Sequence, residues 1–401
     1  MPDFNDHNKV LELLKSAQEA DTDNRERVRE AHLFLDKRDG QWEPYIWNAL
    51  DQRPRYTFDL SNPIVDQIAG EMDQADFDIK VKPAGGDATK DIAQTFDGLI
   101  RNIENISNAP MVFGAAGRSM VAGGMDGWRI VQKFVDGNSF DQDLVIEKIS
   151  NFVDRVWFDP NSEKQDRSDA KYCFVLQGIG KDEYHERWPE GSGMSVDEDR
   201  FGEAYFNKPD LIMVGEFYYI KEVERELVLM SNGQVLEVDD DFDSVVDELA
   251  QLQITEVKRR KRKKNLVFIR TFDAGGWLEE HKETVFSFVP VIPTYGNFKV
   301  FENKTIYWGA VEKIIDAQRV LNYSMSREIE EGALAPRAKY WMTEDQAAGH
   351  EAELSTLNTN SDPVQFYNHD PNIPGAPQQN GGAQINPGLR TISEAMRQVI
   401  S

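Results

Sequence analysis

The last ninety or so residues place two helical patterns on either side of a segment that cannot be helical. From Trp308 to about Glu331, apolar side chains recur at helical spacing and charged side chains lie off this stripe. The apolar positions are Val311, Ile314, Ile315, Leu321, Met325 and Ile329. A helix of this span is about 35 Å long, which exceeds a typical helix of a globular domain. The pattern therefore predicts a projecting helix with one stripe against a partner.

Residues 334–386 interrupt the helical pattern. This segment holds a polar run, Gln378-Gln379-Asn380-Gly381-Gly382, and several prolines in turn contexts, which a helix interior excludes. The turns are Asp362-Pro363, Asp370-Pro371, Ile373-Pro374-Gly375 and Ala376-Pro377. A second helical pattern opens at Pro387-Gly388, and the sequence ends inside it. We therefore expect a truncated product or a fragment.

Composition sets the broad class. Hydrophobic residues make up 40% of the 401 residues and charged residues 29%, which fits a folded chain of two or three domains. No apolar run approaches the roughly 18–20 residues of a membrane-spanning helix, and the acidic first dozen residues lack a signal-peptide pattern. The single cysteine, Cys173, excludes an intrachain disulfide framework, indicates an inert core thiol in a strand, and fits assembly in a reducing cytoplasm.

The net charge of −25 argues against tight binding of duplex DNA, because lysine and arginine supply most of that affinity. Two interpretations of the acidic surface stay open. It keeps the protein in solution, or it lines a conduit through which DNA slides without adhering.

Residues 1–305 predict a mixed α+β body. Helical patterns cover 7–35 and 108–122, begin at Asn62 and Asp87, and recur at 181–188 and, as an acidic helix, at 239–252. In the first helix, the arginines 25, 27 and 29 indicate a solvated or intersubunit face. The strand patterns are Trp128–Phe134, Leu144–Ile149, Val156–Phe158, Tyr172–Gln177, Glu216–Ile220, Glu226–Met230 and Leu266–Phe272.

Turn residues refine this reading of the body. Ser231-Asn232-Gly233 predicts a hairpin turn, since glycine supplies the positive φ that such turns need. Val289-Pro290 and Ile292-Pro293 predict an edge strand or a connector, because proline cannot donate to a central ladder.

Several motifs resemble those of one protein family. Asp316-x-Gln318-x-x-x-Asn322-x-Ser324 is similar to a signature of portal proteins from short-tailed phages, and Asp39-Gly40-Gln41-Trp42 resembles a Gly-Asp-Gln-Trp turn with its first two residues reversed. The others are Asn62-Pro63-Ile64 with Gly70, Phe158-Asp159-Pro160 and Asp166-x-Ser168-Asp169-Ala170. From about residue 30 onward the chain thus resembles a tailed-bacteriophage portal protein, or head-to-tail connector, of the podovirus branch.

The resemblance implies a portal-like fold: a mixed wing body with projecting stem helices and a clip, which forms a ring. By this resemblance residues 1–305 are the wing, 306–333 the first stem helix, 334–386 the clip and 387–401 the start of the second stem helix. Portals of this branch continue beyond that helix, so the resemblance also implies a C-terminal truncation.

The resemblance further implies a non-enzymatic ring of twelve subunits at one capsid vertex. The ring would conduct double-stranded DNA during packaging and ejection. Its partners would be the packaging terminase, the coat protein and the tail or head-completion proteins, with no cofactor and no membrane. The protein would be part of the virion and would assemble in the host cytoplasm.

Candidate functional residues follow from these assignments. The stem and channel candidates are Glu312, Lys313, Asp316, Gln318, Arg319, Asn322, Ser324 and Arg327. We expect the polar residues among them to let neighbouring helices slide or tilt. The clip candidates, Trp341, Phe366 and Tyr367, would pack between subunits or against a partner, or else form a local mini-core.

A run of seven cations stands out in this acidic chain: Lys258, Arg259, Arg260, Lys261, Arg262, Lys263 and Lys264. One interpretation is contact with nucleic acid, although no aromatic residues interleave with the cations. The favoured one is a solvated strand or loop that complements the acidic segment 239–248 or an acidic surface of a neighbouring subunit.

Two other classes of function stay open. Asp243, Glu256 and Lys258 have the residue types of a metal-dependent nuclease, in which carboxylates hold magnesium and a lysine orients water. The six histidines show no zinc spacing, so a histidine metal site is not expected. A structural adaptor that oligomerises through the long helix without a DNA channel is the other alternative.

Overall fold

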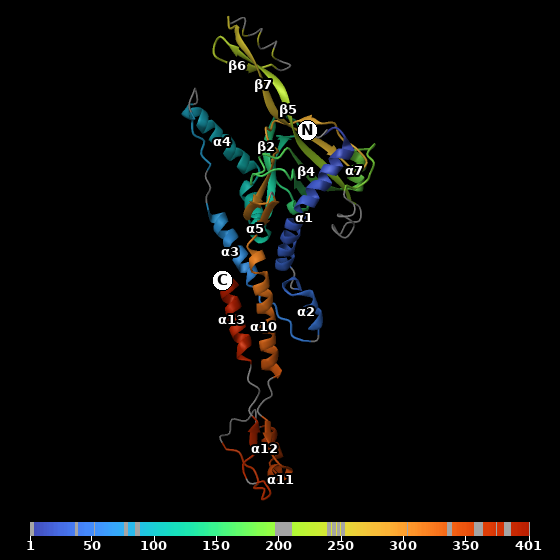
Figure 1. Ribbon diagram of the computed structural model, residues 1–401. Coiled ribbons are helices and arrows are strands. Elements are labelled where there is room, and N and C mark those ends of the chain that lie inside the picture. Colours follow the sequence, from blue (N-terminus) through green and yellow to red (C-terminus); the bar gives the residue numbers. More distant parts are fainter. Residues whose placement is uncertain are drawn as a thin grey trace. The chain divides into compact units, whose positions relative to one another are not determined.

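The computed structural model divides into two compact units, which we describe separately: residues 1–32 with 65–312, and residues 33–64 with 313–401. The residues that the structure describes are 4–36, 39–51, 53–75, 79–84, 89–196, 211–238, 242, 246, 249, 253–302, 304–334, 339–356, 364–373, 375–380 and 386–400. Figure 1 labels the helices and strands.

The first unit contains most of the helices that the sequence predicts. They are α1 (His7–Asp36) and α3 (Ser61–Gln74), which both continue across the boundary between the units, and α4 (Lys90–Ile106), α5 (Ala109–Gly123) and α7 (Lys181–Arg187). The short helix α6 (Phe152–Arg155) was not predicted. The side chain of Thr89 caps α4 by accepting a hydrogen bond from the backbone of Ile92. Helix α5 is capped at its C-terminal end by Gly124, whose φ of +104° suits glycine.

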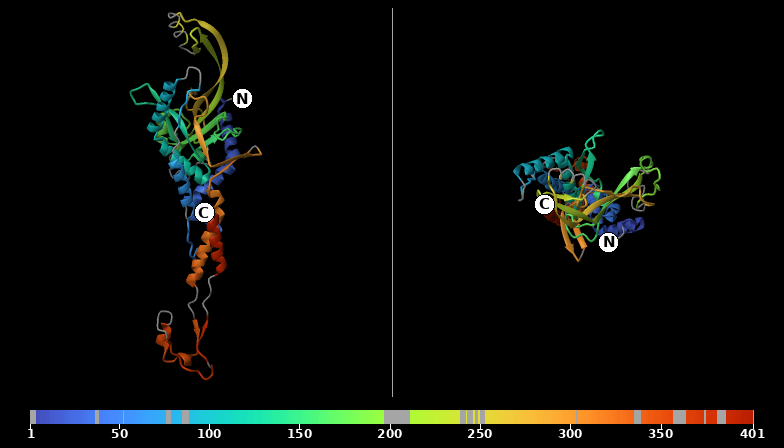
Figure 2. Two further views of the ribbon diagram at one scale, coloured as in Figure 1. Left: turned by 90° about the vertical axis from the view of Figure 1, so that its left-hand side faces the viewer. Right: turned by 90° about the horizontal axis from the view of Figure 1, so that it is seen from above.

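A six-stranded antiparallel sheet forms the centre of the first unit. Its strands are β3 (Val156–Phe158), β4 (Tyr172–Gly180), β5 (Leu211–Met230), β6 (Val235–Glu237), β7 (Glu256–Phe272) and β8 (Lys282–Glu283), in the order β3-β4-β5-β7-β8 with β6 beside β5. The two strands predicted at 216–220 and 226–230 are parts of β5 alone, so that prediction was wrong about the break. Strands β5 and β7 extend beyond β3, β4 and β8 as a long curved two-stranded ribbon, and β6 lies beside the far end of β5 (Figure 2).

Proline marks an edge strand in the second sheet of this unit. The sheet has the order β2-β1-β9, with β1 (Met125–Phe134), β2 (Gln142–Lys148) and β9 (Val291–Tyr295). Pro293 lies in β9 at the edge, as predicted. Strands β10 (Asn297–Phe301) and β11 (Lys304–Trp308) form a separate hairpin.

Apolar clusters cover both faces of β4. Cys173 and Val175 belong to one cluster, whereas Phe174 and Leu176 belong to another, as the alternation of a strand requires. Helix α1 contributes Val28 to the first cluster and Val10, Leu14 and Ala17 to the second. Cys173 is fully buried, and burial raises the pKa of its thiol well above the ordinary value, which agrees with the prediction of an inert core thiol.

The second unit contains the long helix and the segment that follows it. Its elements are η1 (Asp39–Gln41), α2 (Pro44–Ala49), α10 (Ile315–Leu334), β12 (Lys339–Trp341), α11 (Glu344–Ala347), α12 (Glu351–Ser355), β13 (Gln378–Asn380) and α13 (Pro387–Ile400). Helices α10 and α13 pack together through Leu321, Met325, Met396 and Ile400.

The long helix begins later than its sequence pattern indicates. Trp308 is the last residue of β11, and a 3-10 turn, η2 (Val311–Lys313), precedes α10. The backbone of Ala310 donates a hydrogen bond to the carbonyl of Val121, and a Cβ on Gly309 would lie only 2.2 Å from the carbonyl oxygen of Ala122. Residues 308–310 are therefore held against α5 and cannot start the helix. None of the described helices is long and apolar enough to cross a membrane.

Candidate functional site

Polar side chains of α10 bind the irregular segment 54–60 of the same chain. Gln318 donates to the carbonyl of Phe58 at 2.6 Å and accepts from the backbone of Leu60 at 3.2 Å. Asn322 accepts from the backbone of Phe58 at 2.8 Å. Ser326 accepts from the backbone of Tyr56 at 3.0 Å. We call this set of contacts the side-chain ladder.

The geometry of the side-chain ladder follows from two regular spacings. Residues four apart on a helix are about 6.0 Å apart along its axis. Residues two apart in an extended chain are about 6.6 Å apart. Positions 318, 322 and 326 can therefore reach residues 60, 58 and 56 in turn, and the helix side chains act as a neighbouring strand.

The portal-like motifs of the second unit meet at this ladder. Asn322 donates to the carbonyl of Gln41 at 3.2 Å, so the motif on α10 contacts the motif at 39–42. Gly40 of that turn has no room for a side chain, because a Cβ would lie 2.4 Å from the carbonyl oxygen of Leu33. Trp42 is buried and donates to the hydroxyl of Thr57 at 3.2 Å. The motifs thus serve the internal architecture of the unit.

This finding changes the interpretation of three stem candidates. Gln318 and Asn322 are 0% exposed and bond residues of their own unit, and Ser324 is 2% exposed. The contacts of Gln318 and Asn322 favour a role within the subunit. A sliding contact between helices stays a prediction for all three residues.

The charged stem candidates have more exposed positions. Lys313 and Asp316 are exposed. Glu312 lies 3.6 Å from Arg27 in the first unit. In the second unit, Arg319 contacts Glu43 at 3.0 Å and Arg327 contacts Glu330. A channel-lining role for these residues stays a prediction.

The clip candidates lie on the surface of a segment that polar contacts hold together. Trp341 is 70% exposed, Phe366 62% and Tyr367 43%, so the described part of 334–386 does not form the alternative mini-core around them. Its internal contacts run through Gln346, which is buried, completes a capping box with Thr343 and donates to the carbonyl of Gly375. The aromatic side chains are free to contact another molecule.

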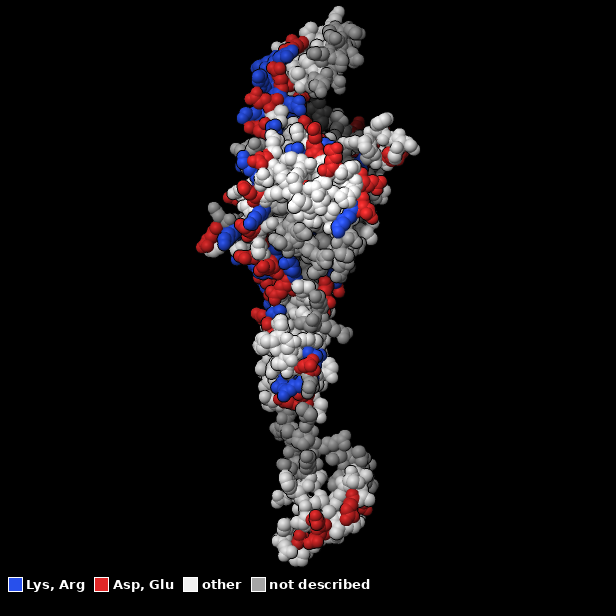
Figure 3. Space-filling view, turned by 90° about the vertical axis from the view of Figure 1, so that its right-hand side faces the viewer, with Lys and Arg blue, Asp and Glu red and all other residues white. Residues whose placement is uncertain are grey.

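The basic run forms an exposed part of β7, where four of its cations meet glutamates. Figure 3 shows the cations along the ribbon of β5 and β7 with carboxylates between them. The ion pairs are Arg259 with Glu226 and Glu256, Arg262 and Lys264 with Glu237, and Lys263 with Glu222. The acidic segment 239–248 lies mostly outside the described residues, so a contact between it and the basic run stays a prediction.

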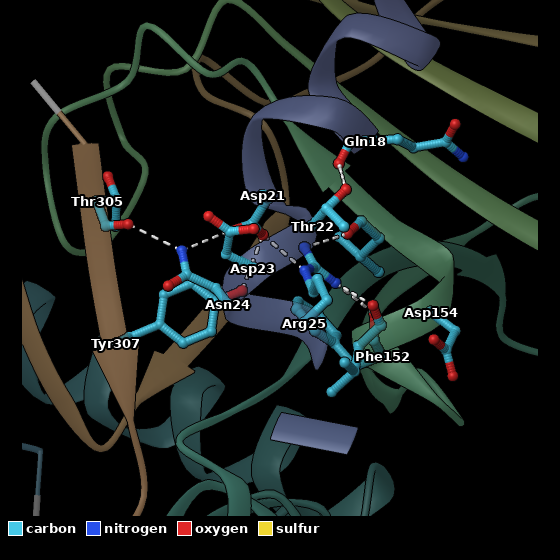
Figure 4. A network of polar contacts seen from close by, with 12 residues as sticks. Gln18, Asp21, Thr22, Asp23, Asn24, Arg25, Phe152, Asp154, Thr305 and Tyr307 are labelled. Carbon is cyan, nitrogen blue, oxygen red and sulfur yellow. Dashed lines mark hydrogen bonds and ion pairs between the residues drawn. The ribbon is translucent and has the colours of Figure 1, made fainter. Parts of the chain in front are cut away.

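Sequence reasoning missed a buried arginine that joins α1 to the first unit's core (Figure 4). Arg25 is 1% exposed, so assigning it to a solvated or intersubunit face was wrong. Its guanidinium donates to Asp21 at 2.6 Å and to the carbonyls of Val153 and Val156, and lies 4.3 Å from the ring centroid of Trp157. The sequence did contain one signal for this arrangement: Asp21 and Arg25 are four residues apart, a spacing that favours an ion pair on a helix.

Two further portal-like motifs, at residues 158–160 and 166–170, lie in a loop beside this arginine. Asp159 and Arg167 line a cavity of about 210 Å³ together with Arg25. Asp169 accepts hydrogen bonds from Ser162 and from the backbone of residues 163 and 164, which fixes the loop. These motifs are structural as well.

The nuclease alternative has no metal site among the described residues. Asp243 lies outside them, and Glu256 is an exposed residue of β7 that pairs with Arg259 at 2.7 Å. No group of three or more histidine, cysteine, aspartate or glutamate side chains in the described part of the chain could hold a metal ion.

The described residues form an α+β fold in which sequence motifs hold loops and helices in place. Comparison with known proteins identifies the family. The chain belongs to the family of phage P22-like portal proteins, whose model matches residues 11–401.

One curated relative is a portal protein of Acyrthosiphon pisum secondary endosymbiont phage 1. It is 24% identical over 337 residues, which cover 80% of this chain and 46% of that protein. The chain therefore spans about half the length of this relative.

Proposed function

We propose that the chain is a subunit of a ring-shaped portal at one vertex of a phage capsid. The ring conducts double-stranded DNA during packaging and ejection, and it docks the packaging terminase, the coat protein and the tail proteins. In this proposal twelve subunits form the ring, residues 1–305 are the wing, 306–333 the first stem segment, 334–386 the clip and 387–401 the start of the second stem helix. The ring is part of the virion and assembles in the host cytoplasm. Membership of the portal family supports the proposal.

The observation that carries ring assembly is an apolar stripe on α4. Ile92, Phe96, Leu99 and Ile106 are 48%, 53%, 52% and 47% exposed, although they recur on one side of the helix. Burying an apolar side chain of this size fully contributes about 1.5–3 kcal/mol. A neighbouring subunit placed on this stripe would recover part of that energy.

The second unit exposes apolar side chains in the same way. In α13, Ser393 and Ile400 are buried, whereas Ile392 is 43% exposed and Val399 is 60% exposed. The clip adds the exposed aromatic side chains described above. Exposed apolar side chains such as these are available for a contact with another subunit.

The charge of the chain supports a conduit. A net charge of −25 repels phosphates, so DNA can move past the protein without adhering to it. Asp316 is an exposed acidic residue of α10 that would face such a conduit.

The test is negative-stain electron microscopy with native mass spectrometry of the purified protein. We expect closed rings with a hole wide enough for a DNA duplex. The double variant Phe96→Asp, Leu99→Asp should prevent ring formation without unfolding the subunit. Its matched control is Gln94→Asp, Asn105→Asp, which adds the same charge to exposed positions on the opposite side of α4.

The outcomes separate the alternatives. A monomer at micromolar concentration would contradict the portal proposal. Closed oligomers without a duplex-wide hole would favour an adaptor. Magnesium-dependent DNA cleavage that Glu256→Ala abolishes would favour the nuclease.

A further inference from the structure

The ribbon of β5 and β7 has two faces, because successive side chains of a strand point to opposite sides. These two faces differ in charge. On one face, which we call the paired face, Glu224 lies opposite Lys263 and Glu226 lies opposite Lys261. Cross-strand pairs of opposite charge stabilise a sheet. The cations of the paired face are thus balanced by the strand beside them.

The other face, which we call the cationic face, has no cross-strand pair of opposite charge between β5 and β7. Its pairs are Lys258 with Leu229, Arg260 with Leu227, Arg262 with Arg225 and Lys264 with Val223. Arg225 and Arg262 are like charges placed directly opposite each other, which opposes strand pairing. Such an arrangement needs negative charge nearby to offset it.

One carboxylate of the neighbouring strand serves three cations on this face. Glu237 of β6 lies 3.2 Å from both Arg262 and Lys264 and 3.7 Å from Arg225. Burial alone raises the pKa of Glu237, but Lys264 and Arg262 outweigh burial and hold the pKa below its ordinary value. Arg225 also reaches Glu283 at 3.5 Å. Among the described residues of the cationic face, positive charge remains in excess.

Lys258 and Arg260 complete the cationic face. Both are exposed, and neither has an ion pair with another described residue. Apolar side chains lie beside them on the same face: Val235 is 56% exposed, and Leu227 and Leu229 are half-buried. The face therefore combines four cations of β7 and Arg225 with an apolar strip.

The described part of the segment between β6 and β7 covers the paired face instead. Phe242 is buried against Val228 and Met230, whose side chains point to the paired side, and Val246 and Leu249 pack on the same cluster. The described residues of this segment leave the cationic face uncovered.

We propose that the cationic face docks on an acidic surface of a second copy of this chain. Residues 221–238 and 253–265 carry nine cations against five carboxylates, whereas the whole chain has a net charge of −25, so the rest of a neighbouring copy is strongly acidic. The apolar strip favours protein over DNA, because phosphate contacts use cationic and polar groups, whereas protein interfaces combine apolar contacts with arginine. This inference rests on the ring assembly proposed above.

The first experiment compares two variants with the same change in net charge. Lys258→Gln, Arg260→Gln alters the cationic face, and Lys261→Gln, Lys263→Gln alters the paired face. We expect the first variant to raise the protein concentration for half-assembly by about tenfold and the second by less than about threefold, since charge complementarity acts only where a partner docks. Equal assembly of both variants and the wild type would overturn the inference and leave the portal proposal intact.

The second experiment identifies the partner of the face. A carbodiimide joins lysines to nearby carboxylates, and rings mixed from isotopically light and heavy chains distinguish contacts between subunits from contacts within one. We expect mixed-isotope links from Lys258 or Lys264 to aspartates or glutamates of the other copy. Links within one chain only would overturn the inference.

Wild-type protein that forms no rings would refute the proposed function instead. If the Lys258→Gln, Arg260→Gln variant assembles normally but loses affinity for a short DNA duplex at low salt, the face serves nucleic acid and the inference is wrong.

Discussion

Arg25 is the residue whose side chain most directly attaches α1 to the core of the first unit. Its N–H groups donate to Asp21 and to backbone carbonyls within α6 and at the start of β3, and its plane lies over Trp157. Lysine keeps the charge but has neither the planar fork nor the stacking surface.

We therefore expect Arg25→Lys to lower the free energy of unfolding by about 2–4 kcal/mol. Urea denaturation followed by tryptophan fluorescence measures the change. Arg27→Lys is the control, because the side chain of Arg27 is 33% exposed and should cost less than about 1 kcal/mol. Equal costs for the two variants would show that the buried contacts of Arg25 are not special.

Asp273 gives a second prediction at the residue scale, which concerns pH. Its buried carboxylate accepts hydrogen bonds from Tyr184, from Ser192 at 2.7 Å and from the backbone of Gly276 at 2.8 Å. Burial alone raises the pKa of Asp273, but these hydrogen bonds outweigh it and lower the pKa below the ordinary value. Because the folded pKa is depressed, the carboxylate contributes stability above about pH 4, and this contribution is lost as the pH falls through the folded pKa.

We expect Asp273→Asn to destabilise the protein by about 2–3 kcal/mol at pH 7. The difference from the wild type should begin to shrink below about pH 4, where the carboxylate becomes protonated in the unfolded chain, and it should shrink further as the pH falls through the depressed folded pKa. Urea midpoints at pH 7 and pH 3 provide the measurement. A difference that does not change with pH would contradict the assignment.

Among the elements, α10 shows what the sequence predicts and what it does not. The stripe of Leu321 and Met325 predicts a helix, and the structure has one. The same pattern treats Gln318 and Asn322 as surface residues, because polarity is its only criterion. Their burial depends on backbone groups at residues 56–60 and 41, which are far away in sequence. Periodicity within one segment contains no information about such partners.

The strands show the same limit. Alternation within Tyr172–Gln177 and the turn at Ser231–Gly233 predicted β4 and the β5–β6 hairpin correctly. The charged residues between Ile220 and Glu226 suggested a break, but they lie in a ribbon where β7 supplies cations opposite glutamates. The charges of these glutamates are offset by cations on the other strand, which the sequence of one segment does not show. A charged segment inside a strand therefore looks like a loop when only its composition is considered.

The side-chain ladder predicts a position-specific result. Ser326→Ala should increase hydrogen exchange mainly at the amide of Tyr56, Asn322→Ala at Phe58 and Gln318→Ala at Leu60, because each side chain is the acceptor for that amide. Exchange read by mass spectrometry with residue-level fragmentation tests this. Val320→Ala, at a position 42% exposed, should leave all three amides unchanged. Identical acceleration of the whole segment in every variant would show that the ladder does not act bond by bond.

At the scale of the whole molecule, the distribution of charge decides what the protein can bind more than its net charge does. The acidic net charge and the basic run looked contradictory in the sequence. In the structure the run is split by strand alternation into a balanced paired face and a cationic face, and glutamates of β5 and β6 take up four of its seven cations. Too few free cations remain to neutralise many phosphates.

We therefore expect the protein to bind duplex DNA only weakly, with a dissociation constant above about 10 μM at about 150 mM salt. Because few phosphates would be neutralised, the logarithm of the binding constant should fall with that of the salt concentration with a slope no steeper than about −3. Fluorescence anisotropy of a labelled duplex across salt concentrations gives both quantities. Lys258→Gln, Arg260→Gln should change this weak binding little, because the proposed partner of those cations is protein. Submicromolar binding with a steep salt slope would mean that the chain binds DNA tightly through many phosphate contacts. Such binding would contradict a role as a conduit through which DNA must move.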